Sequence, residues 1–146
     1  MRTRIAITLL LFVLVGLAGC GRGTSTQAGT TPGAAEPWGR TFLSTSVTEN
    51  GRPKPLVEGT RISLRFDGDR RHVGAQAGCN SMGGPASFEG GKLVVDDLAT
   101  TEMGCDPPRH AQDEWVADFL TGRPTWALDG PVLTLETGTA RIVLED

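Results

Sequence analysis

The chain contains few of the residues that build catalytic or metal sites, and it has no tyrosine. Its 146 residues include 3 cysteines and 2 histidines. His72 and His110 have no histidine partner at helical spacing and no His-Glu-x-x-His motif, so we expect solvated side chains rather than zinc ligands. Ser81 lacks the Gly-x-Ser-x-Gly turn of a serine nucleophile and has no identifiable Asp and His partners. We therefore predict no catalytic residue, no metal and no cofactor.

The chain also lacks an excess of basic charge. It has 14 Lys and Arg against 17 Asp and Glu, a net charge of -3. Binding to nucleic acid depends on clustered basic side chains that neutralise phosphates. The composition therefore argues against a nucleic-acid partner.

A long hydrophobic run is present near the N-terminus. Met1–Arg4 is a short positive segment, and the apolar run Ile5–Leu17 that follows is 13 residues long. This run is too short for a comfortable transmembrane helix and is typical of a signal peptide, predicted here over residues 1–19. Its end, Leu17-Ala18-Gly19-Cys20, resembles the bacterial lipobox. The alternative is an ordinary small-residue cleavage site followed by a chance cysteine.

The lipobox predicts that Cys20 is lipidated and anchors an exported protein to the cell membrane or outer envelope. Durable anchoring needs more than one acyl chain, as the modified cysteine of a lipoprotein carries. Residues 20–36 are rich in Gly, Thr, Ser, Ala and Pro, which is typical of a flexible linker. One folded domain is expected over residues 37–146, because about 110 residues support a single core.

Alternating apolar residues predict seven to eight short strands. The clearest alternation has Ile62, Leu64 and Phe66 on one face. Turn signals at Asp67–Arg70 and Gly90-Gly91 predict two hairpins. The expected strands lie within Trp38–Val47, Thr60–Phe66, His72–Ala77, Pro85–Glu89, Lys92–Asp96, Trp126–Leu128, Val132–Glu136 and Ala140–Leu144.

One helix is predicted after Asp106-Pro107, because aspartate caps helix N-termini and proline is favoured at the first helical position. Gly122 and Pro124 should end the helix. Its apolar stripe is expected to contain Ala111, Trp115, Val116, Phe119 and Leu120. Asp113, Glu114 and Asp118 are expected on its solvated face, and an acid pair or a cation site is the alternative. The fold class is thus α+β with a mostly antiparallel sheet.

Cys79 and Cys105 are the cysteines that remain after Cys20, and they are separated by 26 positions. An exported chain meets oxidising conditions, and neither cysteine belongs to a Cys-x-x-Cys pair. A structural disulfide is the simplest interpretation. Buried free thiols and a metal or redox site are the alternatives.

Four blocks of this sequence resemble the META domain family, an HslJ-like group also catalogued as a domain of unknown function. They are Gly78-Cys79-Asn80 with Gly83-Gly84, Thr101–Cys105, Glu114–Leu120, and Trp126–Leu128 with Leu133–Leu135. The resemblance implies a curved or barrel-like antiparallel sheet with one helix packed on it, in the bacterial envelope. Members are linked to heat-shock response, antibiotic resistance and parasite motility. Met82 departs from the pattern, since an aromatic residue, often tyrosine, usually stands there.

These observations favour a non-catalytic, stress-associated binding or accessory module over a small envelope hydrolase with an unrecognised site. Its partners would be the membrane, through the anchor, and an envelope protein or small ligand, bound by a monomer. Trp115 and Phe119 are expected in the core. The predicted contact region comprises Asn80, Ser81 and Met82 with the exposed edges of Trp38 and Trp126.

Overall fold

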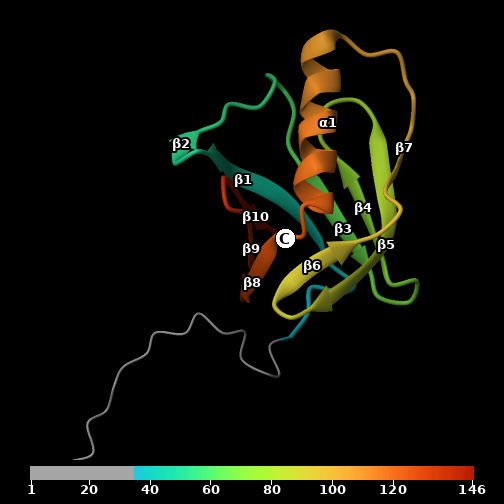
Figure 1. The fold of residues 1–146 in the computed structure, drawn as a ribbon, viewed down its shortest axis with the longest axis vertical. Coiled ribbons are helices and arrows are strands. Elements are labelled where there is room, and N and C mark those ends of the chain that lie inside the picture. The colour runs from blue at the N-terminus through green and yellow to red at the C-terminus, as the bar shows by residue number, and fades with distance from the viewer. Residues whose placement is uncertain (1–34) are drawn as a thin grey trace, which may run out of the picture.

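The computed structural model describes residues 35–146 (Figure 1). The predicted signal peptide, Cys20 and the linker up to residue 34 lie outside the described residues. The strands are β1 Thr41–Glu49, β2 Arg52–Pro53, β3 Ser63–Asp67, β4 His72–Gln76, β5 Ser81–Glu89, β6 Lys92–Val95, β7 Ala99–Thr100, β8 Thr125–Asp129, β9 Val132–Glu136 and β10 Ala140–Glu145, and the helix is α1 Pro107–Thr121. Within these residues, no helix is long and apolar enough to span a membrane.

Eight of the strands described in residues 35–146 form a closed antiparallel barrel. Their order is β10-β9-β8-β6-β5-β4-β3-β1, and β1 pairs with β10 to close it. Strands β6 and β8 have the shortest pairing in the barrel, because only one residue pair, Lys92 with Thr125, joins them. The predicted α+β class with a barrel-like sheet and one helix is confirmed. Two-residue strands β2 and β7 add to it, pairing with β1 and β5.

Alternation along the eight barrel strands places one face of each in the core, as predicted. In β3, Leu64 and Phe66 are buried while Arg65 is exposed. The first hairpin turns where Asp67 Oδ1 accepts hydrogen bonds from the backbone N–H groups of Asp69 and Arg70, both at 3.1 Å. The second turns at Gly90-Gly91, where positive φ angles of 56° and 77° explain the two glycines.

Helix α1 begins and ends where the sequence predicts. Asp106 is its N-cap and accepts a hydrogen bond from Arg109 N at 3.2 Å, and proline follows in the first turn. At the other end, Gly122 N donates to Asp118 O at 2.9 Å. The buried face differs from the predicted stripe, because Ala111 is exposed and two polar residues take part. Its buried residues are Gln112, Asp113, Val116, Phe119 and Leu120.

Helix α1 packs across one end of the barrel, called here the α1 end. Trp115 Nε1 donates to Glu49 Oε1 at the end of β1, at 2.6 Å. Gln112 Nε2 donates to Ala77 O just after β4 and to Thr60 Oγ1 just before β3, both at 2.8 Å. These contacts come from the same end of β1, β3 and β4, so the helix joins strands that neighbour one another in the sheet.

Aromatic side chains close the opposite end, called here the aromatic end. Neighbouring rings have centroids 4.8–6.1 Å apart. The segment that leads into β1 reaches the barrel at this end, where Trp38 packs on Phe66 and Phe88 (Figure 1). The set comprises Trp38, Phe42, Phe66, Phe88 and Trp126.

Candidate functional site

The buried carboxylate of Asp113 organises the α1 end. Its Oδ1 accepts a hydrogen bond from Gly78 N at 2.6 Å, and its Oδ2 accepts from Cys79 N at 3.1 Å and from Asn80 N at 2.8 Å. Asp113 is 3% exposed. The prediction that it lies on the solvated face of the helix is wrong, because three consecutive backbone N–H groups replace water around its charge. Glu114 and Asp118 are exposed, as predicted.

A sequence signal for this role existed. Asp113 lies three positions before Val116 and seven before Leu120, a spacing that puts all three on one helix face. An acidic residue on that face indicates a specific partner, because a charge is rarely buried alone. The partner itself is not local, since the loop 78–80 is more than 30 residues earlier in the chain.

Gly78 allows the loop to approach the helix closely. A Cβ atom there would lie 2.4 Å from Arg109 O, a distance that real contacts do not reach. Gly84 in β5 has the same role against the segment after β6, because its Cβ would lie 2.5 Å from Asp96 O. Both glycines therefore serve close backbone packing.

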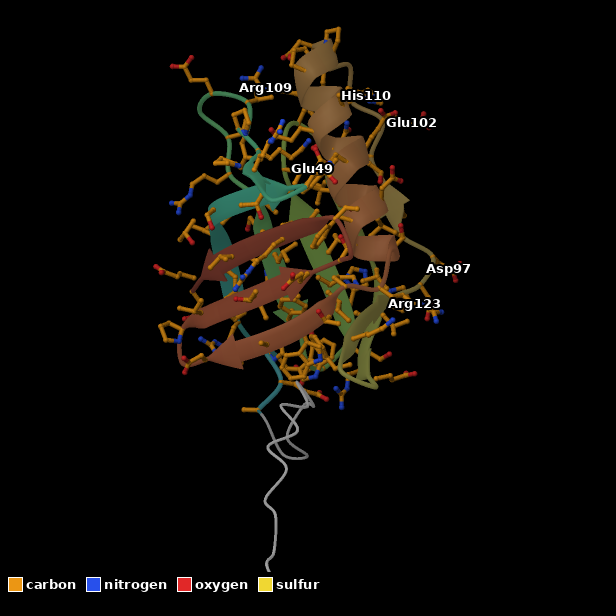
Figure 2. All side chains as sticks on the ribbon, turned by 60° about the vertical axis from the view of Figure 1, so that its left-hand side comes forward. Glu49, Asp97, Glu102, Arg109, His110 and Arg123 are labelled. Atoms are coloured by element: carbon orange, nitrogen blue, oxygen red, sulfur yellow. A yellow bond between two sulfur atoms is a disulfide. The ribbon has the colours of Figure 1, made fainter. Side chains whose placement is uncertain are left out.

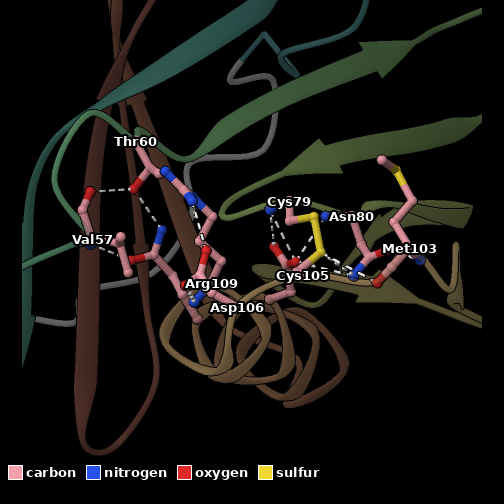
Figure 3. Close-up of polar contacts among 10 residues, drawn as sticks. Val57, Thr60, Cys79, Asn80, Met103, Cys105, Asp106 and Arg109 are labelled. Atoms are coloured by element: carbon pink, nitrogen blue, oxygen red, sulfur yellow. Dashed lines mark hydrogen bonds and ion pairs between the residues drawn. A yellow bond between two sulfur atoms is a disulfide. The ribbon is translucent and has the colours of Figure 1, made fainter.

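The side chain of Asn80 connects the loop to the segment before the helix (Figure 3). Its Oδ1 accepts hydrogen bonds from Thr101 Oγ1 at 3.0 Å and from Met103 N at 2.8 Å. Its Nδ2 donates to Asp113 Oδ2 at 3.3 Å. With 3% exposure and these partners, Asn80 holds the fold together and is not a surface contact, contrary to the prediction.

A disulfide joins the same two segments covalently, between Cys79 and Cys105 (Figure 3). Their Cα atoms are 6.2 Å apart. The structure therefore contains the pairing that the sequence favours. Loop 78–80, segment 101–105 and Asp113 are called the junction below.

The predicted contact region does not form one surface. Met82 is 4% exposed and Trp126 is 9% exposed, so both belong to the core. Trp38 is half-buried against Phe66 and Phe88 at the aromatic end, whereas Ser81 is exposed near the junction. The prediction of an exposed Trp126 edge is wrong, because the closed barrel turns this side chain inward.

A groove of about 510 Å³ lies beside the junction, between α1 and the segment 100–104. Figure 2 shows two of its residues, Glu102 and His110, close together near the start of α1. Glu102 and Met103 lie in a block that carries the family resemblance, but they were not predicted to line a site, because nothing local marks a segment that faces a helix across a groove. The groove is lined by Asn80, Thr100, Thr101, Glu102, Met103, Gly104, His110, Asp113, Glu114 and Ala117.

A sequence profile of the META domain family matches residues 38–145. The chain belongs to the META domain family. The predicted membership is thus confirmed. No curated protein sequence matches this META domain protein.

Solved structures similar to this META domain protein include two determined by NMR and one crystal structure. An NMR structure of a protein from Burkholderia xenovorans has a TM-score of 0.63 at 18% identity, covering 81% of this chain and 94% of that chain. A second NMR structure has a TM-score of 0.56 at 23% identity, and the match covers 72% of this chain and 86% of that chain. The crystal structure, of a DUF4847 family protein from Bacteroides vulgatus, has a TM-score of 0.50 at 12% identity, and the match covers 72% of this chain and 90% of that chain. At these identities the likeness shows the fold alone.

The polar groups near Ser81 and His110 are engaged with each other or with the surface, in the part of the chain that the structure describes. Ser81 Oγ accepts a hydrogen bond from Gln76 Nε2 at 3.1 Å, an amide that cannot serve as a base. His110 Nδ1 lies 3.5 Å from Glu114 Oε1 on the surface of α1. Among residues 35–146, no group of three or more His, Cys, Asp or Glu side chains is placed to hold a metal ion.

The carboxylates whose pKa values are shifted each take part in an ion pair at the surface. The Lys54 ammonium, helped by Trp115 Nε1–H, lowers the pKa of Glu49. Backbone N–H and side-chain hydrogen bonds from Arg109 lower the pKa of Asp106, and Arg40 lowers that of Asp146. A catalytic acid near neutral pH requires the opposite shift, so these groups stabilise structure instead.

Proposed function

We propose that this META domain protein is a lipid-anchored, non-catalytic binding module of the bacterial envelope that acts as a monomer. The segment Leu17–Cys20 supports the anchor, because it resembles a lipobox after an apolar run of signal-peptide length. The polar linker that follows would let the domain move relative to the membrane.

The observation that carries the binding role is the groove between α1 and the segment 100–104. Its volume of about 510 Å³ is in the usual range for ligand sites. Exposed side chains form its walls, including Glu102 and Met103, while the polar atoms of Asn80 and Asp113 at its base are engaged by the fold. Such walls can recognise a partner, but they supply no nucleophile beside a base.

The arrangement of the two barrel ends supports the same proposal. Figure 1 shows the described chain entering the barrel at the end opposite the start of α1. This is the aromatic end, where Trp38 packs, whereas the groove lies beside α1. An anchor before residue 35 would therefore attach to one end of the domain and leave the groove at the other. The family resemblance adds a stress-associated accessory role to the proposal.

Metabolic labelling with an acyl-chain analogue tests the anchor. We expect the full chain to be labelled, its mature N-terminus to be Cys20, and the Cys20→Ala variant to lose the label. A Cys79→Ala, Cys105→Ala double variant is the control, and it should keep the label because the acyl chains attach at residue 20. A label that persists in Cys20→Ala contradicts the anchor.

The non-catalytic part of the proposal is tested by incubating the purified full chain with ester, peptide and glycan substrates. We expect no turnover above a buffer control. Turnover that disappears in Ser81→Ala, or on chelation of metal ions, would replace the binding module by a small envelope hydrolase.

A further inference from the structure

Strand β7, Ala99–Thr100, has one edge that no strand covers within the described residues. In β7, Thr100 faces Met82 of β5, and Thr101 N donates to Ser81 O at 2.9 Å. Neighbouring residues of a strand direct their backbone groups to opposite sides. Thr100 N–H and C=O therefore point away from β5. Within residues 35–146, β5 is the one strand that pairs with β7.

The hydrogen bonds on the β5 side continue beyond β7. Thr101 is directed at β5, and Met103 N donates to Asn80 Oδ1 at 2.8 Å. Glu102, between these two, makes no backbone hydrogen bond among the described residues. The disulfide at Cys105 and the side chain of Asn80 hold this edge in place. A fixed, uncovered edge is the template to which an extended peptide adds as a strand.

The groove beside this edge is acidic. Glu102 and Glu114 are exposed on its two walls, and Glu114 pairs only with His110 among the described residues. None of the described residues that line the groove is Lys or Arg. The third carboxylate, Asp113, is engaged by backbone N–H groups of loop 78–80. The charge complementary to the walls is therefore positive.

An apolar contact point accompanies the charge. Met103 is 59% exposed, and with Leu43 it makes up the exposed large hydrophobic residues of the described chain. Its backbone is fixed by Asn80, so the side chain remains at the groove. Methionine is flexible and polarisable, and it suits partners of varied shape. An edge, two carboxylates and a methionine together match an extended segment with alternating basic and apolar residues.

We propose that the groove binds an extended basic peptide segment of a partner protein, which adds as a strand beside residues 100–102 with its Lys or Arg side chains at Glu102 and Glu114. This inference rests on the proposed binding function and names the chemistry of its partner. Nucleic acid is disfavoured at the same groove because phosphates carry the sign of its walls.

Titration of the full chain, in a non-ionic detergent, with the peptide Lys-Val-Lys-Thr-Lys-Val-Lys tests the proposal. We expect saturable binding that weakens with added salt, with the largest amide shift changes in NMR at Thr100 and Glu102. The double variant Glu102→Gln, Glu114→Gln should bind about five- to tenfold more weakly, since two exposed ion pairs are lost. The matched control Glu58→Gln, Glu136→Gln removes the same charge outside the groove and should bind like the wild type.

Two further ligands separate strand addition from simple charge attraction. The same peptide with alternate backbone nitrogens methylated keeps its charge but loses the N–H groups of one edge, and it should bind at least about tenfold more weakly. Spermidine has charge without a peptide backbone and should not shift the Thr100 amide. Equal binding by the methylated peptide, or by the groove and control variants, would overturn the proposal.

The peptide is recovered after the titration, and its mass is measured by mass spectrometry to show whether it is intact or cleaved. An intact peptide that does not bind contradicts the inference about the groove while leaving the anchored module standing. A cleaved peptide contradicts the non-catalytic function instead. The two failures are thereby distinguished.

Discussion

At the α1 end of the barrel, two polar side chains and a disulfide hold segments that are distant in sequence, whereas at the aromatic end packed rings do so. Asp113 and Asn80 act through hydrogen bonds to particular atoms of loop 78–80 and segment 101–103. The aromatic rings act through contact area, which is less directional. Equally buried positions at the two ends should therefore respond differently to substitution. The exposed groove lies beside the end that is held by directional bonds.

Loss of the Asp113 carboxylate should have the largest effect. Asp113→Ala leaves the N–H groups of Gly78, Cys79 and Asn80 buried without an acceptor, so we expect a loss of about 3–5 kcal/mol in the free energy of unfolding. Denaturant unfolding measures it. Asp118→Ala on the exposed side of α1 is the control and should change stability by less than about 0.5 kcal/mol. Equal losses of stability in the two variants would contradict the conclusion that the Asp113 carboxylate organises the α1 end.

Loss of the disulfide should come next. The double variant Cys79→Ala, Cys105→Ala should lose about 3 kcal/mol, because the unfolded chain is no longer constrained by a closed loop. Hydrogen exchange should accelerate most in segment 101–104, while β8, β9 and β10 keep their relative protection. Uniform acceleration across the barrel would show that the bond does not act locally at the junction.

Trp126→Phe should have a small effect, which sharpens the contrast between the ends. Trp126 Nε1 is buried and has no hydrogen-bond partner within residues 35–146. Phenylalanine removes this unsatisfied donor and keeps an aromatic ring beside Phe88, so the two effects nearly cancel, within about 1 kcal/mol. Asp113→Asn, which changes shape as little, should cost more in the same unfolding experiment. The reverse order would contradict the comparison.

The smallest expected effect on stability is that of lowering the pH from neutral. The folded-state pKa values of Glu49, Asp106 and Asp146 lie below the ordinary values of 4.5, 3.8 and 3.8. Groups with lowered pKa values contribute stability above their unfolded pKa and lose it as the pH falls through the folded one. We expect flat stability from pH 7 to 5 and a decline below about pH 4.5. Glu49→Gln should reduce the decline, and an unchanged profile would exclude that ion pair as a contributor.

Much of the barrel was predictable from local patterns. The alternation around Leu64 and Phe66, the glycines at the second turn, and the Asp106 cap of α1 act over a few residues. The two-residue strands β2 and β7 were not predicted, because pairs such as Ala99-Thr100 carry no periodic signal and are set by the neighbouring strand.

The candidate site was predicted less well, since its geometry depends on contacts between distant segments. Gly78, Cys79 and Asn80 were identified as a block that carries the family resemblance, but Asn80 was assigned to a contact surface instead of the fold. Trp126 was placed outside because a short strand does not reveal which face turns inward once the barrel closes. The groove walls, Glu102 and Glu114, come from separate elements that the junction brings together.

Short-range periodicity, helix capping and characteristic blocks of residues were enough to predict the α+β class, the helix bounds, the Cys79–Cys105 pair and the family. The tertiary structure alone decided that Asp113 is buried, that Asn80 is a structural clip and that an acidic groove runs beside an uncovered strand edge. The two sets of features differ in the distance along the chain over which the responsible interactions act. Capping and alternation act between neighbours in the chain, whereas a buried charge is stable only where folding brings donors to it from more than 30 residues away.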